Sequence, residues 1–266
     1  MRIFDSHIHI YPDKIASKAA QNIGQFYNIE MDSDGTLAHL LDICEKNGIK
    51  KCLVHSVATK HDQVPKINDF IYSAVQAHPD MFVGFCTLHP DMDVKETEAE
   101  LDRVIKMGLR GIKLHPDCQK FRIDDKHAME MYEVIDGRLP ILFHTGDKRF
   151  DYSNPDRMKR MALRFPKQRV IAAHFGGYSV WEDAVKTLPG LDNLWVDESS
   201  SLPFITPEKA KEYINAYGDD RVFFGTDYPM WDAKDELERF DRIDLTDTQR
   251  EKILWKNAAD FLSVNS

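Results

Sequence analysis

The chain has 266 residues, of which 42% are hydrophobic, and it carries a formal net charge of -9. The acidic balance argues against a general binder of phosphate backbones, so nucleic acid is not expected as a partner. No run of about 20 apolar residues occurs, and the amino terminus enters a strand-like segment directly. We therefore expect a cytoplasmic protein that does not bind membranes, with a single domain over residues 1–266.

The first strand-like segment, "RIFDSHIHI", carries two histidines on one face. Side chains alternate along a strand, so His7 and His9 point the same way, about 7 Å apart, with Ile8 and Ile10 opposite. This spacing suits chelation of a metal ion. A hydrogen-bonded histidine pair in a core would look the same in sequence, so the pair needs support from the rest of the chain.

Short β-rich segments alternate with helical segments along the whole sequence. The predicted strands lie within residues 2–10, 50–57, 82–90, 110–116, 140–146, 169–177, 193–200 and 221–229. The predicted helices are 36–47, 66–77, 94–107, 126–135, 156–165, 181–188, 207–217 and 246–262. Eight such alternations favour an α/β fold of the (β/α)8 TIM-barrel class, with a doubly wound open sheet as the alternative. Residues 11–35 are the only long stretch predicted to be irregular, and could form a wall or lid of the site.

Polar residues gather near the carboxyl ends of the predicted strands. They are Asp227 and seven of the eleven histidines: His7, His9, His55, His89, His115, His144 and His174. In a barrel these ends surround one cavity, where active sites of this fold are built. A zinc-like ion needs a few nitrogen and oxygen donors and one open position, which His7, His9, His144 and Asp227 could supply.

The four cysteines do not add to this ligand set. Cys44, Cys52, Cys86 and Cys118 are far apart in sequence and form no C-x-x-C pair. A zinc ribbon and a thioredoxin-like motif are therefore not predicted. We expect mostly reduced thiols that pack as small apolar residues.

Taken together, these motifs resemble the amidohydrolase superfamily, most closely its amidohydrolase-2 branch. The resemblance rests on "DSHIH", "FHTG", "AHFGG" and "FGTDYP" in this order, with "GIKLHP" and "KNAADFL" also typical. It implies one divalent metal ion, most simply zinc, held by His7, His9, His144 and Asp227. It also implies a catalytic imidazole at His174 and a proton-accepting role for Asp227.

Further residues near the strand ends are candidates for contact with substrate or for supporting roles. Lys113 could bridge two metal ions as a carbamylated lysine, bind a substrate carboxylate, or pair with a carboxylate such as Asp5. Lys148 and Arg149 could attract a substrate carboxylate or form a solvated pair in a loop. The remaining candidates, which could equally serve loop packing, are His55, His89, His115, Tyr178, Tyr228 and Trp231.

The resemblance includes both hydrolases and metal-dependent decarboxylases. The compact chain favours hydrolysis of an ester, lactone or amide bond in a small, carboxylated substrate by a metal-activated water. The alternative is non-oxidative decarboxylation of a small carboxylic acid. A PHP-type phosphoesterase is disfavoured because no second histidine follows Asp227, and a non-enzymatic metal-binding barrel because His174 is present. A homo-oligomer is left open.

Overall fold

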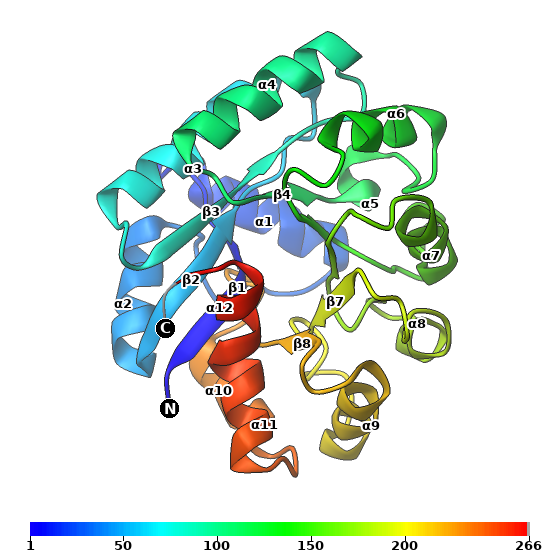
Figure 1. The fold of residues 1–266 in the computed structure, drawn as a ribbon. Coiled ribbons are helices and arrows are strands. Elements are labelled where there is room, and N and C mark those ends of the chain that lie inside the picture. The colour runs from blue at the N-terminus through cyan, green and yellow to red at the C-terminus, as the bar shows by residue number, and fades with distance from the viewer. Residues whose placement is uncertain (265–266) are drawn as a thin grey trace. The chain divides into compact units, whose positions relative to one another are not determined.

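The computed structural model describes residues 1–264, in which strands and helices alternate. The eight strands belong to one sheet in the order β1 to β8 (Figure 1). This confirms the predicted (β/α)8 barrel. The chain divides into two compact units. Unit 1 holds Met1–His55, Ala74–Val83 and the part from Glu198 onward, and unit 2 holds Ser56–Ser73 and Gly84–Asp197.

The strands of unit 1 bring the amino-terminal strand against the segment near residue 225. They are β1 (Ile3–His9), β2 (Ile49–His55) and β8 (Val222–Phe223). Strands β1 and β2 are parallel, and His9 pairs in register with His55. Beyond β8, the amide of Ser6 donates to Phe224 O (2.9 Å) and the amide of His9 donates to Tyr228 O (2.8 Å). The backbone therefore fixes the residues after β8 against β1.

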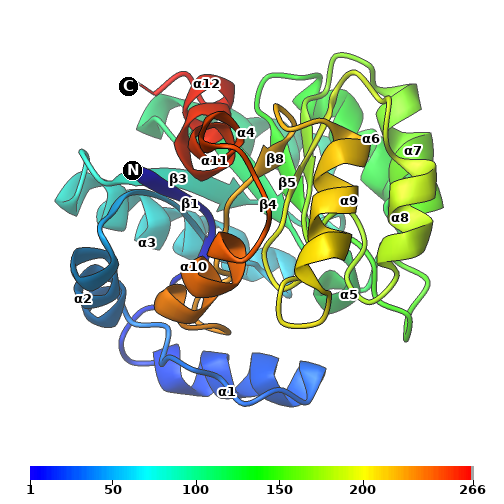
Figure 2. The same cartoon turned by 90° about the horizontal axis from the view of Figure 1, so that it is seen from below.

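The helices of unit 1 include the carboxy-terminal helical segment. They are α1 (Ala16–Tyr27), α2 (Leu37–Asn47), α9 (Pro207–Tyr217), α10 (Ala233–Asp241), α11 (Asp247–Glu251), the π-helical turn η2 (Lys252–Lys256) and α12 (Asn257–Phe261). The segment from α11 to α12 is continuous and runs beside β1 and β8 (Figures 1 and 2). The predicted helix over 246–262 is present, with a π turn in its middle.

Two helices of unit 1 were not predicted. The prediction of an irregular stretch over residues 11–35 is wrong, because α1 occupies Ala16–Tyr27. This helix buries only Ala16, Ala20 and Gly24, and its N-cap makes no side-chain hydrogen bond. It therefore shows neither a stripe of large apolar residues nor a capping residue in sequence. The second unpredicted helix, α10, is rich in charged residues.

Unit 2 contains most of the parallel sheet. Its strands are β3 (Phe82–Thr87, which begins in unit 1), β4 (Gly111–Leu114), β5 (Ile141–Phe143), β6 (Val170–Ala172) and β7 (Leu194–Asp197). Each of these strands pairs in parallel with the next. Strands β3 to β6 consist entirely of buried residues. Burial on both faces is typical of strands covered by helices.

Short connections and helices cover the strands of unit 2. They are η1 (His61–Gln63), α3 (Val64–Ala77, which ends in unit 1), α4 (Val94–Met107), α5 (Pro116–Gln119), α6 (Lys126–Ile135), α7 (Pro155–Arg164) and α8 (Trp181–Thr187). Helix α4 packs beside α6, and α7 beside α8 (Figure 1). The bounds of α4 and α6 agree with the predicted ones, because charged caps and regular apolar spacing mark both helices.

Two expectations from composition can be compared with the structure. All four cysteines are free thiols, and Cys44, Cys52 and Cys86 are buried, as predicted. Across residues 1–264, no helix has both the length and the apolar character that a membrane crossing requires.

Candidate active site

Three of the four predicted metal ligands converge in unit 1. His7 and His9 project from β1, and Asp227 follows β8. The Nε2 atoms of His7 and His9 each lie 3.4 Å from Asp227 Oδ1. Two ligands that are each about 2.1 Å from a tetrahedral ion are separated by about 3.4 Å. The two nitrogens and the oxygen therefore have the spacing and the chemistry that suit one divalent cation.

The backbone after β8 is shaped to bring Asp227 to this position. Asp227 has a positive φ of 57°, which is uncommon for a residue other than glycine. A Cβ atom at Gly225 would lie 2.9 Å from His7 Cβ, so a larger residue would push the segment away from β1. The "FGTD" motif thus combines a glycine that permits close approach with a strained aspartate, as is common at functional sites.

Asp5 anchors the same segment through three hydrogen bonds. Its carboxylate accepts hydrogen bonds from the Thr226 amide (3.0 Å), from Thr226 Oγ1 (2.6 Å) and from the His7 amide (3.1 Å). Burial raises the pKa of Asp5 to about 6. Asp5 therefore joins β1 to the residues after β8, and its role in unit 1 is to position the backbone around His7 and Asp227.

His55 lies beside the two histidines of β1. Its ring centroid is 5.0 Å from that of His7 and 4.4 Å from that of His9, with both contacts edge to face. Donor atoms of these three histidines all lie within 4.8 Å of one another. The structure therefore places His55 next to His7 and His9, and its role stays a prediction.

Two serines and one tryptophan support the ligands of unit 1. Ser199 Oγ lies 3.1 Å from His7 Nδ1, and Ser200 Oγ donates to Asp227 Oδ2 at 2.5 Å. Trp231 Nε1 donates in turn to Ser200 Oγ at 2.8 Å. Trp231 was a candidate from sequence, but neither serine was. The run of serines after the apolar "LWV" strand was the available signal.

Unit 2 brings together three of the predicted histidines. His115, His144 and His174 follow β4, β5 and β6. His144 Nδ1 and His174 Nε2 are hydrogen-bonded at 3.0 Å, and the rings of His115 and His144 stack at 4.0 Å. His174 has a positive φ of 62°, which again marks a strained residue at a strand end. One of the two hydrogen-bonded nitrogens must carry a proton, so this cluster can hold and pass protons.

A buried carboxylate that sequence analysis missed lies behind these histidines. Asp117 Oδ2 accepts a hydrogen bond from Ser153 Oγ (2.5 Å) and lies 3.7 Å from His144 Nε2. Burial raises the pKa of Asp117 to about 7. A carboxylate in this place orients the imidazole through its second nitrogen, as in many metal sites. The only signal in sequence was an aspartate two residues after His115.

Lys113 and His89 occupy buried positions in unit 2. Lys113 is fully buried on β4, between Thr87 on β3 and Leu142 on β5 in register. Its bridging, substrate-binding and ion-pairing roles stay predictions. The Asp91 amide donates to His89 Nδ1 at 3.2 Å, so the ring of His89 is tied to the turn that follows it. Burial lowers the pKa of His89, which favours the neutral ring.

Both residues of the predicted anion-binding pair, Lys148 and Arg149, are exposed, and Arg149 is engaged in an ion pair. The Arg149 guanidinium makes hydrogen bonds of 2.6 to 3.1 Å with both carboxylate oxygens of Asp147, which is buried. Lys148 is exposed, and its amide donates to Ser179 Oγ. Tyr178 makes edge contact with His174, at 5.9 Å between ring centroids. Of these residues, Tyr178 is the one that touches the imidazole cluster.

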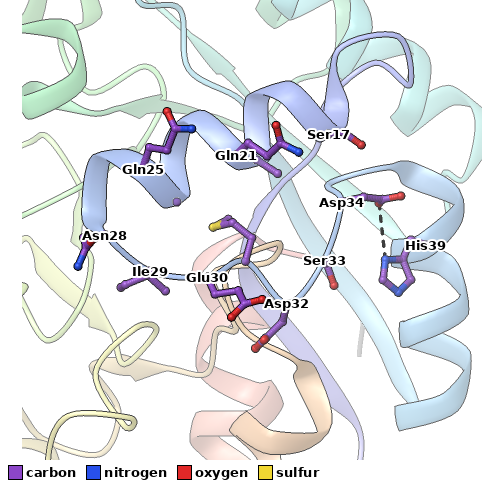
Figure 3. Close-up of a pocket in the computed structure, with 13 residues that line it drawn as sticks. Ser17, Gln21, Gln25, Asn28, Ile29, Glu30, Asp32, Ser33, Asp34 and His39 are labelled. Atoms are coloured by element: carbon purple, nitrogen blue, oxygen red, sulfur yellow. Dashed lines mark ion pairs between the residues drawn. The ribbon is translucent and has the colours of Figure 1, made fainter.

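A cavity of about 690 Å³ in unit 1 lies apart from the predicted ligands. It is formed by α1, residues 28–34 and the start of α2 (Figure 3). Two of its three carboxylates are held by local contacts, because Asp32 accepts from the Asp232 amide and Asp34 accepts from Thr36 and lies 3.6 Å from His39. None of the predicted ligands lines this cavity. Its size therefore does not identify it as the active site.

Comparison with known proteins identifies relatives that match most of the chain. Residues 54–264 match the amidohydrolase family (Amidohydro_2). A curated relative is the gamma-resorcylate decarboxylase of Polaromonas sp. JS666, which is 20% identical over an alignment 264 positions long, and the match covers 75% of this chain and 76% of the relative. The match extends over most of both sequences.

Solved structures with the same fold were also found. An uncharacterized TIM-barrel protein from Bordetella bronchiseptica has a TM-score of 0.81 and 20% identity, with 99% of each chain covered. A dihydroxybenzoic acid decarboxylase from Polaromonas sp. JS666, solved with manganese and 2-nitroresorcinol, has a TM-score of 0.76 and 16% identity, with 99% and 97% covered. The 5-carboxyvanillate decarboxylase of Sphingomonas paucimobilis has a TM-score of 0.74 and 16% identity, with 99% of each chain covered. These structures confirm the fold.

The comparisons correct the prediction of a hydrolase. The characterised relatives named above are decarboxylases, so hydrolysis as the main interpretation is wrong and the decarboxylase alternative is the better supported one. The prediction relied on the compact length of the chain. That argument fails because the chain spans 97% or more of the solved decarboxylases. The predicted zinc ion is not confirmed, because two of the solved structures hold manganese.

Proposed function

Since the chain belongs to the amidohydrolase family, we propose that it is a metal-dependent, non-oxidative decarboxylase of a small aromatic carboxylic acid. The observation that carries the proposal is the convergence of His7, His9 and Asp227 in a chain whose curated relative is a gamma-resorcylate decarboxylase. The relative supports the reaction class, and the 3.4 Å spacing of the three side chains in unit 1 supports them as ligands of the ion that we propose.

The reaction removes a carboxylate and replaces it with hydrogen. The bond between the substrate carbon and its carboxylate breaks, carbon dioxide leaves, and the electron pair remains on the carbon. That carbon then takes up one proton, so the enzyme must deliver a proton and exclude competing reactions. When bound, the divalent ion supplies positive charge that holds an oxygen of the substrate.

We assign roles to individual residues as follows. His7, His9 and Asp227, which converge in unit 1, hold the ion, and His144 stays the fourth ligand that the sequence predicts. His174 holds a proton at its ring and is suited to transfer it, because its Nε2 already shares a hydrogen bond with His144 Nδ1. Asp227 is the second group that can accept a proton. Tyr178 forms an aromatic contact beside His174 that suits a planar substrate.

The identity of the ion is part of the proposal. Three imidazoles and one carboxylate suit several borderline divalent metals, including zinc and manganese. Because a solved relative holds manganese, we propose a single divalent ion and would test Mn²⁺ before Zn²⁺. The proposed partner is a small carboxylated molecule.

The test is an activity assay with metal-loaded protein. Protein stripped with chelator and reloaded with Mn²⁺ or Zn²⁺ would be incubated with 2,6-dihydroxybenzoate, 5-carboxyvanillate and related hydroxybenzoates. We expect release of carbon dioxide and the matching loss of the aromatic acid, dependent on metal. The His174→Ala variant should lose about 10²- to 10⁴-fold in rate. The His127→Ala variant, changed at an exposed residue of α6, should match the parent protein.

A panel of small esters and lactones tests for hydrolysis in the same assay. Metal-dependent turnover of an ester or lactone, with no carbon dioxide from any carboxylate, would contradict the proposal. Decarboxylation by the His174→Ala variant at the rate of the parent protein would instead contradict the role assigned to that imidazole.

A further inference from the structure

We infer that the serine segment after β7 orients the metal ligands of unit 1, with Ser199 acting on His7 and Ser200, backed by Trp231, acting on Asp227. This inference rests on the proposed ligand assignment and goes beyond it, because it names three positioning residues that do not bind the ion themselves. All the residues involved belong to unit 1.

The contact between Ser200 and Asp227 distinguishes the two carboxylate oxygens. Ser200 Oγ donates to Oδ2 at 2.5 Å, while Oδ1 faces the Nε2 atoms of His7 and His9 at 3.4 Å. A free carboxylate can rotate and offer either oxygen. The hydrogen bond to Oδ2 stops that rotation, so Oδ1 is the oxygen presented to a cation.

Trp231 fixes the direction of this hydrogen bond. An indole N–H can only donate, so Ser200 Oγ must accept from Trp231 Nε1 at 2.8 Å. The single hydroxyl proton of Ser200 is then left for Asp227 Oδ2. Met230 Sδ, at 3.6 Å from the same hydroxyl, is a weak competing acceptor. The three residues form a chain of donors that ends on the carboxylate.

Ser199 performs the equivalent task for His7. Its hydroxyl lies 3.1 Å from His7 Nδ1, whereas His7 Nε2 faces Asp227 Oδ1. An imidazole that binds a cation through Nε2 carries its proton on Nδ1 and needs an acceptor there. Ser199 supplies that acceptor, so the ring is held in the tautomer and orientation that metal binding requires.

The backbone explains how two adjacent serines can serve one cluster. Neighbouring side chains of an extended strand point to opposite faces. Ser200 instead has a left-handed φ of 50°, which turns the chain just after β7. Both hydroxyls therefore reach ligands, although they are consecutive in sequence. Both serines are at most 1% exposed.

The experiment measures binding of Mn²⁺ alone, by equilibrium dialysis, to metal-free protein. We expect Ser200→Ala and Ser199→Ala each to weaken the affinity by about 10- to 100-fold, the usual effect of removing such a support. Trp231→Phe keeps the aromatic ring but removes the N–H, and should weaken the affinity less. Because Trp231 acts through Ser200, the double variant should bind Mn²⁺ no more weakly than Ser200→Ala alone.

Ser201→Ala is the matched control, because Ser201 is equally buried but donates to the backbone oxygen of Ser199. Its affinity for Mn²⁺ should equal that of the parent. Melting temperatures of the metal-free proteins separate the two roles, since a merely structural serine would lower stability and leave the affinity unchanged. The part-exposed Trp231→Phe variant keeps the test open if a serine variant fails to fold.

The inference is overturned if Ser200→Ala binds Mn²⁺ as tightly as Ser201→Ala, or if the effects of Ser200→Ala and Trp231→Phe add. Parent protein that binds neither Mn²⁺ nor Zn²⁺ would overturn it together with the ligand assignment. Tight Mn²⁺ binding that Ser200→Ala weakens, in a protein without decarboxylase activity, would support this inference and contradict only the proposed function.

Discussion

The predicted ligands of unit 1 and the histidines of unit 2 are built in different ways. In unit 1, two imidazole nitrogens face one carboxylate oxygen at 3.4 Å. Serine hydroxyl groups contact the remaining polar atoms, His7 Nδ1 and Asp227 Oδ2. In unit 2, His144 is bonded to His174 and stacked on His115, and the carboxylate of Asp117 lies behind them. The carboxylate of Asp227 therefore lies among the imidazoles of the first cluster. The carboxylate of Asp117 instead contacts one imidazole of the second cluster at its far nitrogen, away from the bond to His174.

This difference suggests a division of labour between the two clusters. A cation is attracted where a carboxylate oxygen and imidazole nitrogens meet, which describes His7, His9 and Asp227 in unit 1. Hydrogen-bonded imidazoles are instead suited to move a proton, which describes His144 and His174 in unit 2. Substitutions should accordingly separate into those that remove metal and those that leave metal but remove turnover.

The largest effect is expected from Asp227→Asn, which removes the negative charge of the first cluster. The variant should bind Mn²⁺ more weakly and lose about 10³-fold or more in decarboxylation rate, since both a ligand and a proton acceptor are changed. Metal content and turnover would be measured together. Asp232→Asn is the matched control, because asparagine caps a helix as well as aspartate does. Equal activity in the two variants would contradict the assignment of Asp227 as a ligand and proton acceptor.

The next largest effect is expected from His174→Ala, which alters the second cluster alone. Loss of a proton-transferring group typically costs about 10² to 10⁴ in rate, so turnover should fall by that factor while most of the bound metal remains. Metal analysis beside rate measurements checks both parts. A variant that lost its metal as fully as Asp227→Asn would erase the distinction between the clusters.

A smaller effect is expected from Asp117→Asn, which changes the support of His144. The variant loses the carboxylate 3.7 Å from His144 Nε2, and activity or metal affinity should fall by about 10- to 100-fold. Asp125→Asn, at the N-cap of α6, makes no side-chain cap bond and serves as control. If Asp117→Asn behaves like this control, the carboxylate has no part in orienting the imidazole.

The smallest effect concerns stability and a buried acid of unit 1. Burial raises the pKa of Glu236 to about 8 from 4.5, so the folded state binds a proton that the unfolded state releases. The stability from this proton is fully present below about pH 4.5 and is lost as the pH rises toward 8. Glu236→Gln should therefore flatten the fall in melting temperature of metal-free protein across that range. A curve parallel to that of the parent would show that Glu236 is not the group responsible.

The candidate residues that could be predicted from sequence are those marked by a regular pattern of neighbouring residues. Strand alternation placed His7 and His9 on one face, and apolar runs that end in glycine-containing turns marked His144, His174 and Asp227. Ser199, Ser200 and Asp117 were missed because a hydroxyl or carboxylate just after a strand is ordinary in loops. Only the three-dimensional contacts distinguish them from neighbours such as Ser201.

Some features could not be derived from local pattern at all. Helix α1 packs through alanine and glycine, so apolar periodicity does not reveal it. The salt bridge between Arg149 and the buried Asp147 depends on a turn that the letters "GDKRF" do not specify. The reaction class also lies outside the ligand motifs, because one set of ligands can serve hydrolysis or decarboxylation and the choice depends on how substrate is held.

The π turn η2 gives the end of the chain an influence on Asp227. The amide of Phe224 donates to Ile253 O at 3.0 Å, and Phe224 O in turn accepts from the amide and hydroxyl of Ser6. The carboxy-terminal helix thus acts as a bonding partner for the backbone three residues before Asp227. A chain truncated before Lys252 would keep every proposed ligand but would lose the hydrogen bond from the Phe224 amide to Ile253 O. The backbone that leads to Asp227 therefore depends on hydrogen bonds to η2 as well as to β1.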